Sequence, residues 1–280
     1  MNSKLKIIIT VLVYFAISIS SSGLCIANDK TKRAEQLMDL AGSTWAITFL
    51  VEEIALEQVK EKIIYPDNGL TETERSIYFK QFELEGMLQS VRQVIVDSLT
   101  EKELDELIDY FSQPLIVKML ENEKAEQLGN PQIDTKKYLK SIMNNLPSKS
   151  RIELIHELVD VSLMVEQQVY FNAVMIYEKN KASLSYQDEY DEEQAQRLEY
   201  YIENFKQNMA DSIRPEMRLV FMRNYDSFSD GEISSLISLM KEKKRLKYQA
   251  LFVDTLAEVL AERIRKGITA LLVHREKKAS

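Results

Sequence analysis

An apolar stripe at helical spacing is the feature that most constrains the fold of this chain. Leu104, Leu107, Ile108 and Phe111 fall at i, i+3, i+4 and i+7, so one face of a helix carries all four side chains. Similar periodicity runs through almost all of the 280 residues, without a convincing alternating strand pattern. The 7 glycines and 5 prolines are too few for the frequent tight turns of sheet-rich folds. The sequence therefore predicts an all-α protein.

Local signals mark where the helices begin and end. A Ser or Thr with a Glu three residues later is typical of a capping box, in which each side chain pairs with a backbone N–H group of the first turn. The predicted capping boxes begin at Thr71, Thr100, Ser150 and Ser229. Proline and glycine predict breaks at residues 66–69, 129–131, 147 and 214–215.

The first 27 residues have the pattern of a secretory signal peptide. Lys4 and Lys6 precede an apolar run over residues 7–19, which is too short to span a bilayer comfortably. Cys25 and Ala27 are small residues three positions and one position before the predicted cleavage site, which follows Ala27. Two alternatives stay open: an uncleaved membrane anchor, and a lipoprotein that carries its lipid on Cys25.

Charge and cysteine content restrict the partners and the means of stabilisation. Cleavage would remove the single cysteine and two lysines, and would change the net charge from −8 to −10. An exported chain without cysteine has to hold its fold by packing alone. The negative balance opposes binding to phosphate backbones, so we predict no nucleic-acid partner.

The chain also contains an internal repeat. After shifts of 118 and 129 residues, two segments of the first half overlay two segments of the second, residues 35–40 on 153–158 and residues 99–104 on 228–233. Periodicity alone makes helices look similar, but two capped starts in the same order favour a duplication. We therefore expect tandem helical domains over residues 28–130 and 150–280, joined by a linker with a short helix over 131–149. The two halves form either two bundles or one pseudo-symmetric bundle.

Residues 100–118 carry a recognisable motif. It consists of a helix start, an aromatic pair, a proline and a lysine, at Thr100, Tyr110, Phe111, Pro114 and Lys118. The segment resembles the core of the domain-of-unknown-function 2059 family of exported bacterial helical proteins, although Gln113 and Ile116 replace the usual Ser and Gly. The second half keeps only the helix start, so the resemblance implies a tandem copy whose second member is degenerate. It implies a helical fold and a periplasmic location, and it brings no catalytic residue.

Patterns for catalysis or metal binding are scarce. Glu153 and His156 form one Glu-x-x-His step, whereas carboxylate-bridged di-metal bundles need two such steps. No serine lies in a Gly-x-Ser-x-Gly motif, and the chain without residues 1–27 has no cysteine nucleophile. We predict no metal, no cofactor and no catalytic residue. A hydrolase that uses carboxylates alone on an envelope polymer is the third hypothesis for the function.

Tyr110, Phe111 and Pro114 are the predicted binding residues. They form either a recognition patch or a helix junction, in which Pro114 starts a new helix and the aromatic rings pack the corner. The leading hypothesis is a non-enzymatic periplasmic adaptor or scaffold that binds an envelope protein or peptide. The alternative is a carrier or chaperone for an apolar small molecule or lipid, held between the two halves. The pattern selects no oligomeric state.

A dense basic run lies at residues 241–247 (KEKKRLK). Its charges fall on most sides of a helix, which suits a solvated helix end near a C-terminus. Binding to anionic lipid headgroups or to an acidic partner is the alternative.

Overall fold

The computed structural model describes residues 29–64, 70–128, 131–144, 146–186 and 191–279. These residues form helices and contain no strand, which confirms the all-α prediction. The predicted signal peptide and the predicted break at residues 66–69 lie outside the described residues. Among the helices in the described ranges, none combines the length and the apolar character needed to cross a bilayer.

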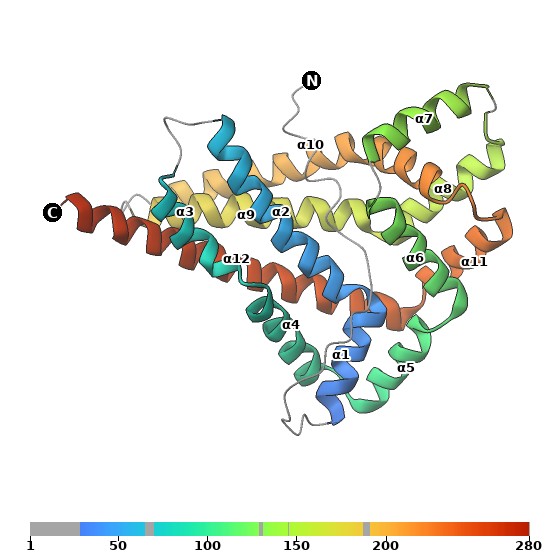
Figure 1. The fold of residues 1–280 in the computed structure, drawn as a ribbon, viewed down its shortest axis with the longest axis horizontal. Helices are drawn as coiled ribbons and strands as arrows, with labels where there is room; N and C mark the ends of the chain where they lie inside the picture. The colour runs from blue at the N-terminus through green and yellow to red at the C-terminus, as the bar shows by residue number, and fades with distance from the viewer. Residues whose placement is uncertain (1–28, 65–69, 129–130, 145, 187–190, 280) are drawn as a thin grey trace.

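The helices follow one another in two sets joined by α7 (Figure 1). The first set is α1 (Asp29–Ala41), α2 (Ser43–Ile64), α3 (Glu72–Phe79), the short 3-10 turn η3 (Lys80–Phe82), α4 (Leu84–Ser98), α5 (Glu101–Phe111) and α6 (Pro114–Leu128). After α7 (Pro131–Asn144), the second set is α8 (Lys149–Ser162), α9 (Met164–Tyr186), α10 (Glu192–Asn224), α11 (Asp230–Met240) and α12 (Lys243–Ala279).

Three of the four predicted capping boxes are confirmed. The hydroxyls of Thr71, Thr100 and Ser229 each accept a hydrogen bond from the N–H group of the Glu three residues later, and that Glu carboxylate accepts one from the N–H group of the cap. The prediction for Ser150 is wrong. Ser148 caps α8 instead, and its hydroxyl accepts a hydrogen bond from the Arg151 N–H at 3.1 Å. The first serine after the break at residue 147 takes the cap, so Ser150 already lies in the first turn of α8.

The predicted break at residues 214–215 is also wrong, because α10 continues through Pro215. The proline removes one backbone hydrogen bond and crowds the preceding turn. However, Pro215 is exposed, while Ile213, Met217 and Phe221 are buried at a spacing of four residues on the opposite side of the helix. Burial of this apolar face before and after the proline offsets the local loss.

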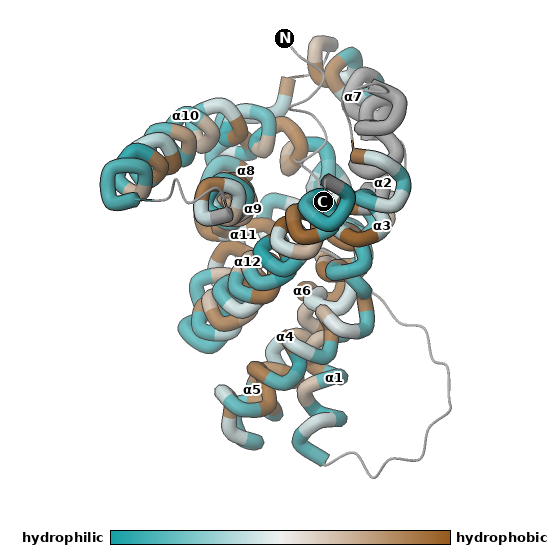
Figure 2. Tube along the Cα trace, turned by 90° about the vertical axis from the view of Figure 1, so that its left-hand side faces the viewer, coloured by the Kyte–Doolittle hydropathy of each residue, from teal (hydrophilic) through white to brown (hydrophobic). Residues whose placement is uncertain are grey.

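One hydrophobic cluster extends through both sets of helices. The C-terminal helix α12 contacts α3, η3, α4 and α5 of the first set and α9 of the second. The helix α9 in turn lies between α12 and α10 (Figure 2). The two halves therefore share a continuous core, and α12 is the element that both of them pack against.

Two ion pairs connect the halves reciprocally. Lys118 on α6 pairs with Glu232 on α11 at 2.5 Å, and Lys247 on α12 pairs with Glu103 on α5. Each of these glutamates also closes a capping box. The hydrogen bond from the lysine, followed by those from the cap residue, lowers the pKa of Glu103 and that of Glu232 to about 2. The start of one helix in each half is thus tied to a lysine of the other half.

The lowered pKa values predict how stability depends on pH. A carboxylate whose pKa is lowered by folding stabilises the folded state above its ordinary pKa of 4.5, and this contribution is lost as the pH falls toward about 2. Replacing both residues, Glu103→Gln and Glu232→Gln, keeps a capping acceptor but removes the charge. We expect the free energy of unfolding, measured with urea across this pH range, to fall less steeply in the double variant than in the wild type.

The control for this experiment is Glu121→Gln, an exposed position on α6. This variant should keep the full dependence on pH. A double variant with the wild-type slope would mean that the two ion pairs add nothing to stability in solution.

Helix α12 approaches α3 closely at Gly267. A Cβ atom at this position would lie 2.7 Å from Cδ2 of Tyr78 and 3.3 Å from its carbonyl oxygen. The Tyr78 ring has little room to move, because its centroid lies 5.0 Å from that of Phe79 and 5.4 Å from that of Phe82. The contact between α12 and α3 therefore requires a residue without a side chain.

We predict that Gly267→Ala lowers the free energy of unfolding by about 1–3 kcal/mol, because the methyl group forces the two helices apart. This loss should appear although alanine favours a helix by about 1 kcal/mol relative to glycine. Gly231→Ala on α11 is the matched control, since no atom lies within 4 Å of the Cβ position there. Urea unfolding of both variants tests the prediction, and equal stabilities would contradict a tight contact.

Candidate functional site

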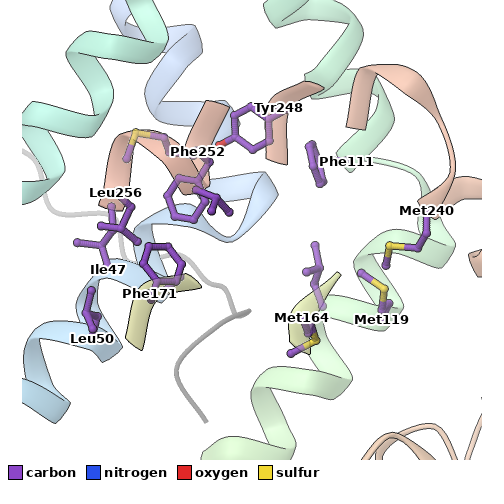
Figure 3. Packing of buried hydrophobic residues seen from close by; sticks show 14 of the residues in the cluster. Ile47, Leu50, Phe111, Met119, Met164, Phe171, Met240, Tyr248, Phe252 and Leu256 are labelled. Carbon is purple, nitrogen blue, oxygen red and sulfur yellow. The ribbon is translucent and has the colours of Figure 1, made fainter. Parts of the chain in front are cut away.

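A cavity of about 100 Å³ lies where the two halves meet. Residues from the α1–α2 junction and from α5, α6, α8, α9, α10, α11 and α12 line it. Much of its wall is apolar and includes Phe111, Met119, Met164 and Met240, which Figure 3 shows grouped around one region of the core. Methionine side chains are flexible and polarisable, so this wall can adapt its shape to a small guest.

The structure places two of the three predicted binding residues in this cavity wall. Tyr110, at 1% exposure, and Phe111 are buried at the end of α5, and their rings meet edge to face at 4.9 Å. The Tyr110 hydroxyl donates a hydrogen bond to the carbonyl of Leu239 on α11 at 2.9 Å. Pro114 is exposed at the first position of α6 and does not line the cavity. This is the predicted helix junction, and a binding role for the aromatic pair stays a prediction that now concerns the interior.

The principal charged group in the wall is Arg245, which is 8% exposed and which the sequence did not single out. Its guanidinium donates hydrogen bonds to the carbonyls of Val161 (3.1 Å), Ser162 (3.1 Å) and Met240 (3.0 Å). These carbonyls end α8 and α11, where unpaired acceptors and the negative ends of the helix dipoles favour a cation. Burial lowers the pKa of Arg245, but an arginine stays protonated near neutral pH.

Three lysines near Arg245 form ion pairs within the chain. The pairs are Lys241 with Glu157 (2.6 Å), Lys244 with Glu242 (3.4 Å) and Lys247 with Glu103. Much of the positive charge of residues 241–247 is therefore balanced by carboxylates of the same molecule. This arrangement weighs against the use of the run as a lipid-binding or acidic-partner surface.

Tyrosine hydroxyls provide further polar groups in the wall. The Tyr225 hydroxyl donates a hydrogen bond to the buried carboxylate of Glu123, and the Tyr248 and Ser43 hydroxyls share one at 2.7 Å. Burial raises the pKa of Tyr110 to about 12 and also raises the pKa of Tyr248. These two phenols are therefore protonated at neutral pH.

Two glutamine side chains at the cavity have hydrogen-bonding capacity that the described residues do not use. Gln249 donates to the carbonyl of Ser162 at 2.9 Å, while its amide oxygen is buried and accepts no hydrogen bond from them. Gln167, 9% exposed, makes no side-chain hydrogen bond to the described residues. Because buried polar groups nearly always have a partner, the two amides favour a guest that both donates and accepts hydrogen bonds.

The chemistry of this wall suits recognition more than proton transfer. The cavity lining contains no histidine, cysteine or lysine. His156 of the predicted Glu-x-x-His step is half-buried on α8 outside the cavity, and burial lowers its pKa. Nowhere in the described ranges do three His, Cys, Asp or Glu side chains come together as metal ligands.

Comparisons with known proteins find no matching family model, no matching characterised protein and no matching solved structure. The resemblance of residues 100–118 to the domain-of-unknown-function 2059 family stays a prediction. The function of the chain is therefore inferred from its own cavity, surface and charge.

Substitutions in the aromatic pair test its place in the core. Tyr110→Phe removes the donor to the Leu239 carbonyl and should lower the free energy of unfolding by about 1 kcal/mol. Phe111→Ala leaves a void and should lower it by about 3–5 kcal/mol. Urea unfolding of each variant measures both losses.

Tyr200→Phe is the matched control, because Tyr200 on α10 is 74% exposed and its loss of a hydroxyl should change stability by less than about 0.5 kcal/mol. If all three variants were as stable as the wild type, Tyr110 and Phe111 would not be packed as described.

Proposed function

We propose that the protein is a non-enzymatic carrier that holds a small amphipathic molecule in the cavity between its halves. The observation that carries this proposal is the pair of buried amides, Gln167 and Gln249, with unused hydrogen-bonding capacity beside a largely apolar wall. An apolar guest with a hydroxyl or amide group would contact the methionines and Phe111 and pair with the two amides.

The size of the cavity limits the guest. A protein cavity of about 150 Å³ accommodates benzene, so about 100 Å³ suits a molecule of about five or six non-hydrogen atoms. Pockets for drug-sized ligands are about three to ten times larger. A small molecule therefore fits the observed volume, whereas a whole lipid does not.

The adaptor hypothesis remains a separate prediction. It relied on Tyr110 and Phe111 as an exposed patch, and both side chains are buried. A protein partner would have to use another surface of the molecule. We also propose, from the pattern of residues 1–27 alone, that the carrier is exported to the periplasm.

We further propose that the two halves arose by duplication. The shift of 118 residues carries Arg33 onto Arg151, and these arginines bind Asp105 (3.1 Å) and Asp230 (2.8 Å) respectively. The shift of 129 residues carries Lys118 onto Lys247 and Glu103 onto Glu232, so the two ion pairs between the halves exchange under it. Such reciprocity supports a pseudo-two-fold relation, in which the cavity lies between equivalent parts of the two halves.

Organic extraction of the protein isolated from its own cells tests the carrier proposal. The wild type should release a small molecule in near-stoichiometric amount, detected by mass spectrometry. Ala46→Leu places a larger side chain in the cavity wall, so this variant should release none. Its free energy of unfolding should equal or exceed that of the empty wild type, because the leucine fills the void.

Ala257→Leu is the matched control, since Ala257 is buried on α12 outside the cavity. It should lower stability by about 1–3 kcal/mol through overpacking, while the folded protein keeps its guest. Absence of any guest in the wild type, together with a more stable Ala46→Leu variant, would make the cavity an ordinary packing void.

A further inference from the structure

The outer face of α7 and the residues after it expose large apolar side chains. Met143 is 81% exposed and Leu146 is 78% exposed, and Leu139 lies one helical turn before Met143 with 37% exposed. The opposite side of α7 faces the body of the protein, where the Tyr138 hydroxyl donates a hydrogen bond to the carbonyl of Met222 on α10 at 3.1 Å. The apolar surface of this amphipathic helix thus continues past the part that the protein itself covers.

The same stretch is basic, in contrast to the rest of the chain. Residues 137–152 include Lys137, Lys140, Lys149 and Arg151 and no acidic residue, whereas the whole chain has a net charge of −8. The three lysines are exposed, and Arg151 is paired with Asp230 at 2.8 Å. The exposed apolar side chains therefore lie beside positive charge.

Nearby acidic groups lie on the inner side of α7. Burial and the charge of Asp226 raise the pKa of Tyr138, whose ring faces the body of the protein. Glu153, on the next helix, lies 3.6 Å from Lys149. No described Asp or Glu belongs to the exposed stretch itself, so its outer side presents lysines and apolar side chains together.

We propose that this surface, made of Leu139, Met143 and Leu146 with Lys137, Lys140 and Lys149, docks on a bilayer that contains anionic phospholipid. The apolar side chains enter the boundary between headgroups and acyl chains, and the lysines pair with lipid phosphates. Two such signals, apolar insertion and basic charge, are what reversible membrane attachment requires.

A bilayer fits this surface better than a protein groove does. A stable protein interface buries about 800 Å² on each partner and needs complementary shape, which three side chains at a helix end do not supply. A bilayer adapts to the inserted side chains and attracts lysines over several ångströms. The surface uses none of the residues that line the cavity, so the proposal stands independently of the carrier function.

Sedimentation with vesicles tests the proposal on the purified full chain. Vesicles of phosphatidylglycerol and phosphatidylcholine in equal parts should bind the wild type, and vesicles of phosphatidylcholine alone should bind it much less. The double variant Met143→Ser and Leu146→Ser should bind the anionic vesicles about tenfold more weakly or worse. Raised salt should weaken binding of the wild type, because it screens the lysines.

The matched control is the double variant Tyr200→Ser and Tyr201→Ser, which removes two exposed side chains from α10. It should bind vesicles as the wild type does. All three proteins carry the same residues 1–28, so any binding by that apolar segment is common to them. Circular dichroism should show equal helix content, because the replaced side chains are exposed.

Three results would overturn the proposal. They are equal binding to neutral and anionic vesicles, undiminished binding of the α7 variant, and a variant that loses a co-isolated protein while its vesicle binding is unchanged. The last result would assign the α7 surface to a protein partner.

Discussion

Burial of the apolar side of α12 is the interaction on which the rest of the structure depends. Leu256, Leu260 and Ile264 are each about fully buried at a spacing of four residues, and the helix contacts elements of both halves. Burying one such side chain stabilises a fold by about 1.5–3 kcal/mol, whereas an exposed ion pair contributes about 0–1 kcal/mol. Packing along α12 therefore holds the halves together, and the reciprocal Lys–Glu pairs mainly set their relative orientation.

Local chemistry explains which parts of the fold could be predicted. Capping boxes at Thr71, Thr100 and Ser229 involve residues three positions apart, so the sequence alone identifies them. Ser150 was predicted wrongly because two nearby serines compete for one cap. Pro215 was predicted wrongly because contacts on both sides of it outweigh a local preference, and such contacts are not visible in a window of sequence.

The candidate site could be predicted only in part, for a related reason. The aromatic pair at Tyr110 and Phe111 was visible as a motif, but the surfaces that cover it come from α11 and α12, more than a hundred residues later. Arg245 was hidden in a basic run that is typical of a solvated helix end. An arginine among lysines was the available signal, because a guanidinium can serve several carbonyls at once. Gln167 and Gln249 belong to no sequence pattern.

The position of α12 at the end of the chain has a consequence for biosynthesis. The first half buries its core against a helix that the ribosome makes last, so a nascent chain that lacks α12 has one wall of its core missing. Contacts between helices this far apart in sequence also form slowly compared with the helices themselves. A growing chain of this design stays open until synthesis is nearly finished, and an open chain can still be threaded through a narrow pore.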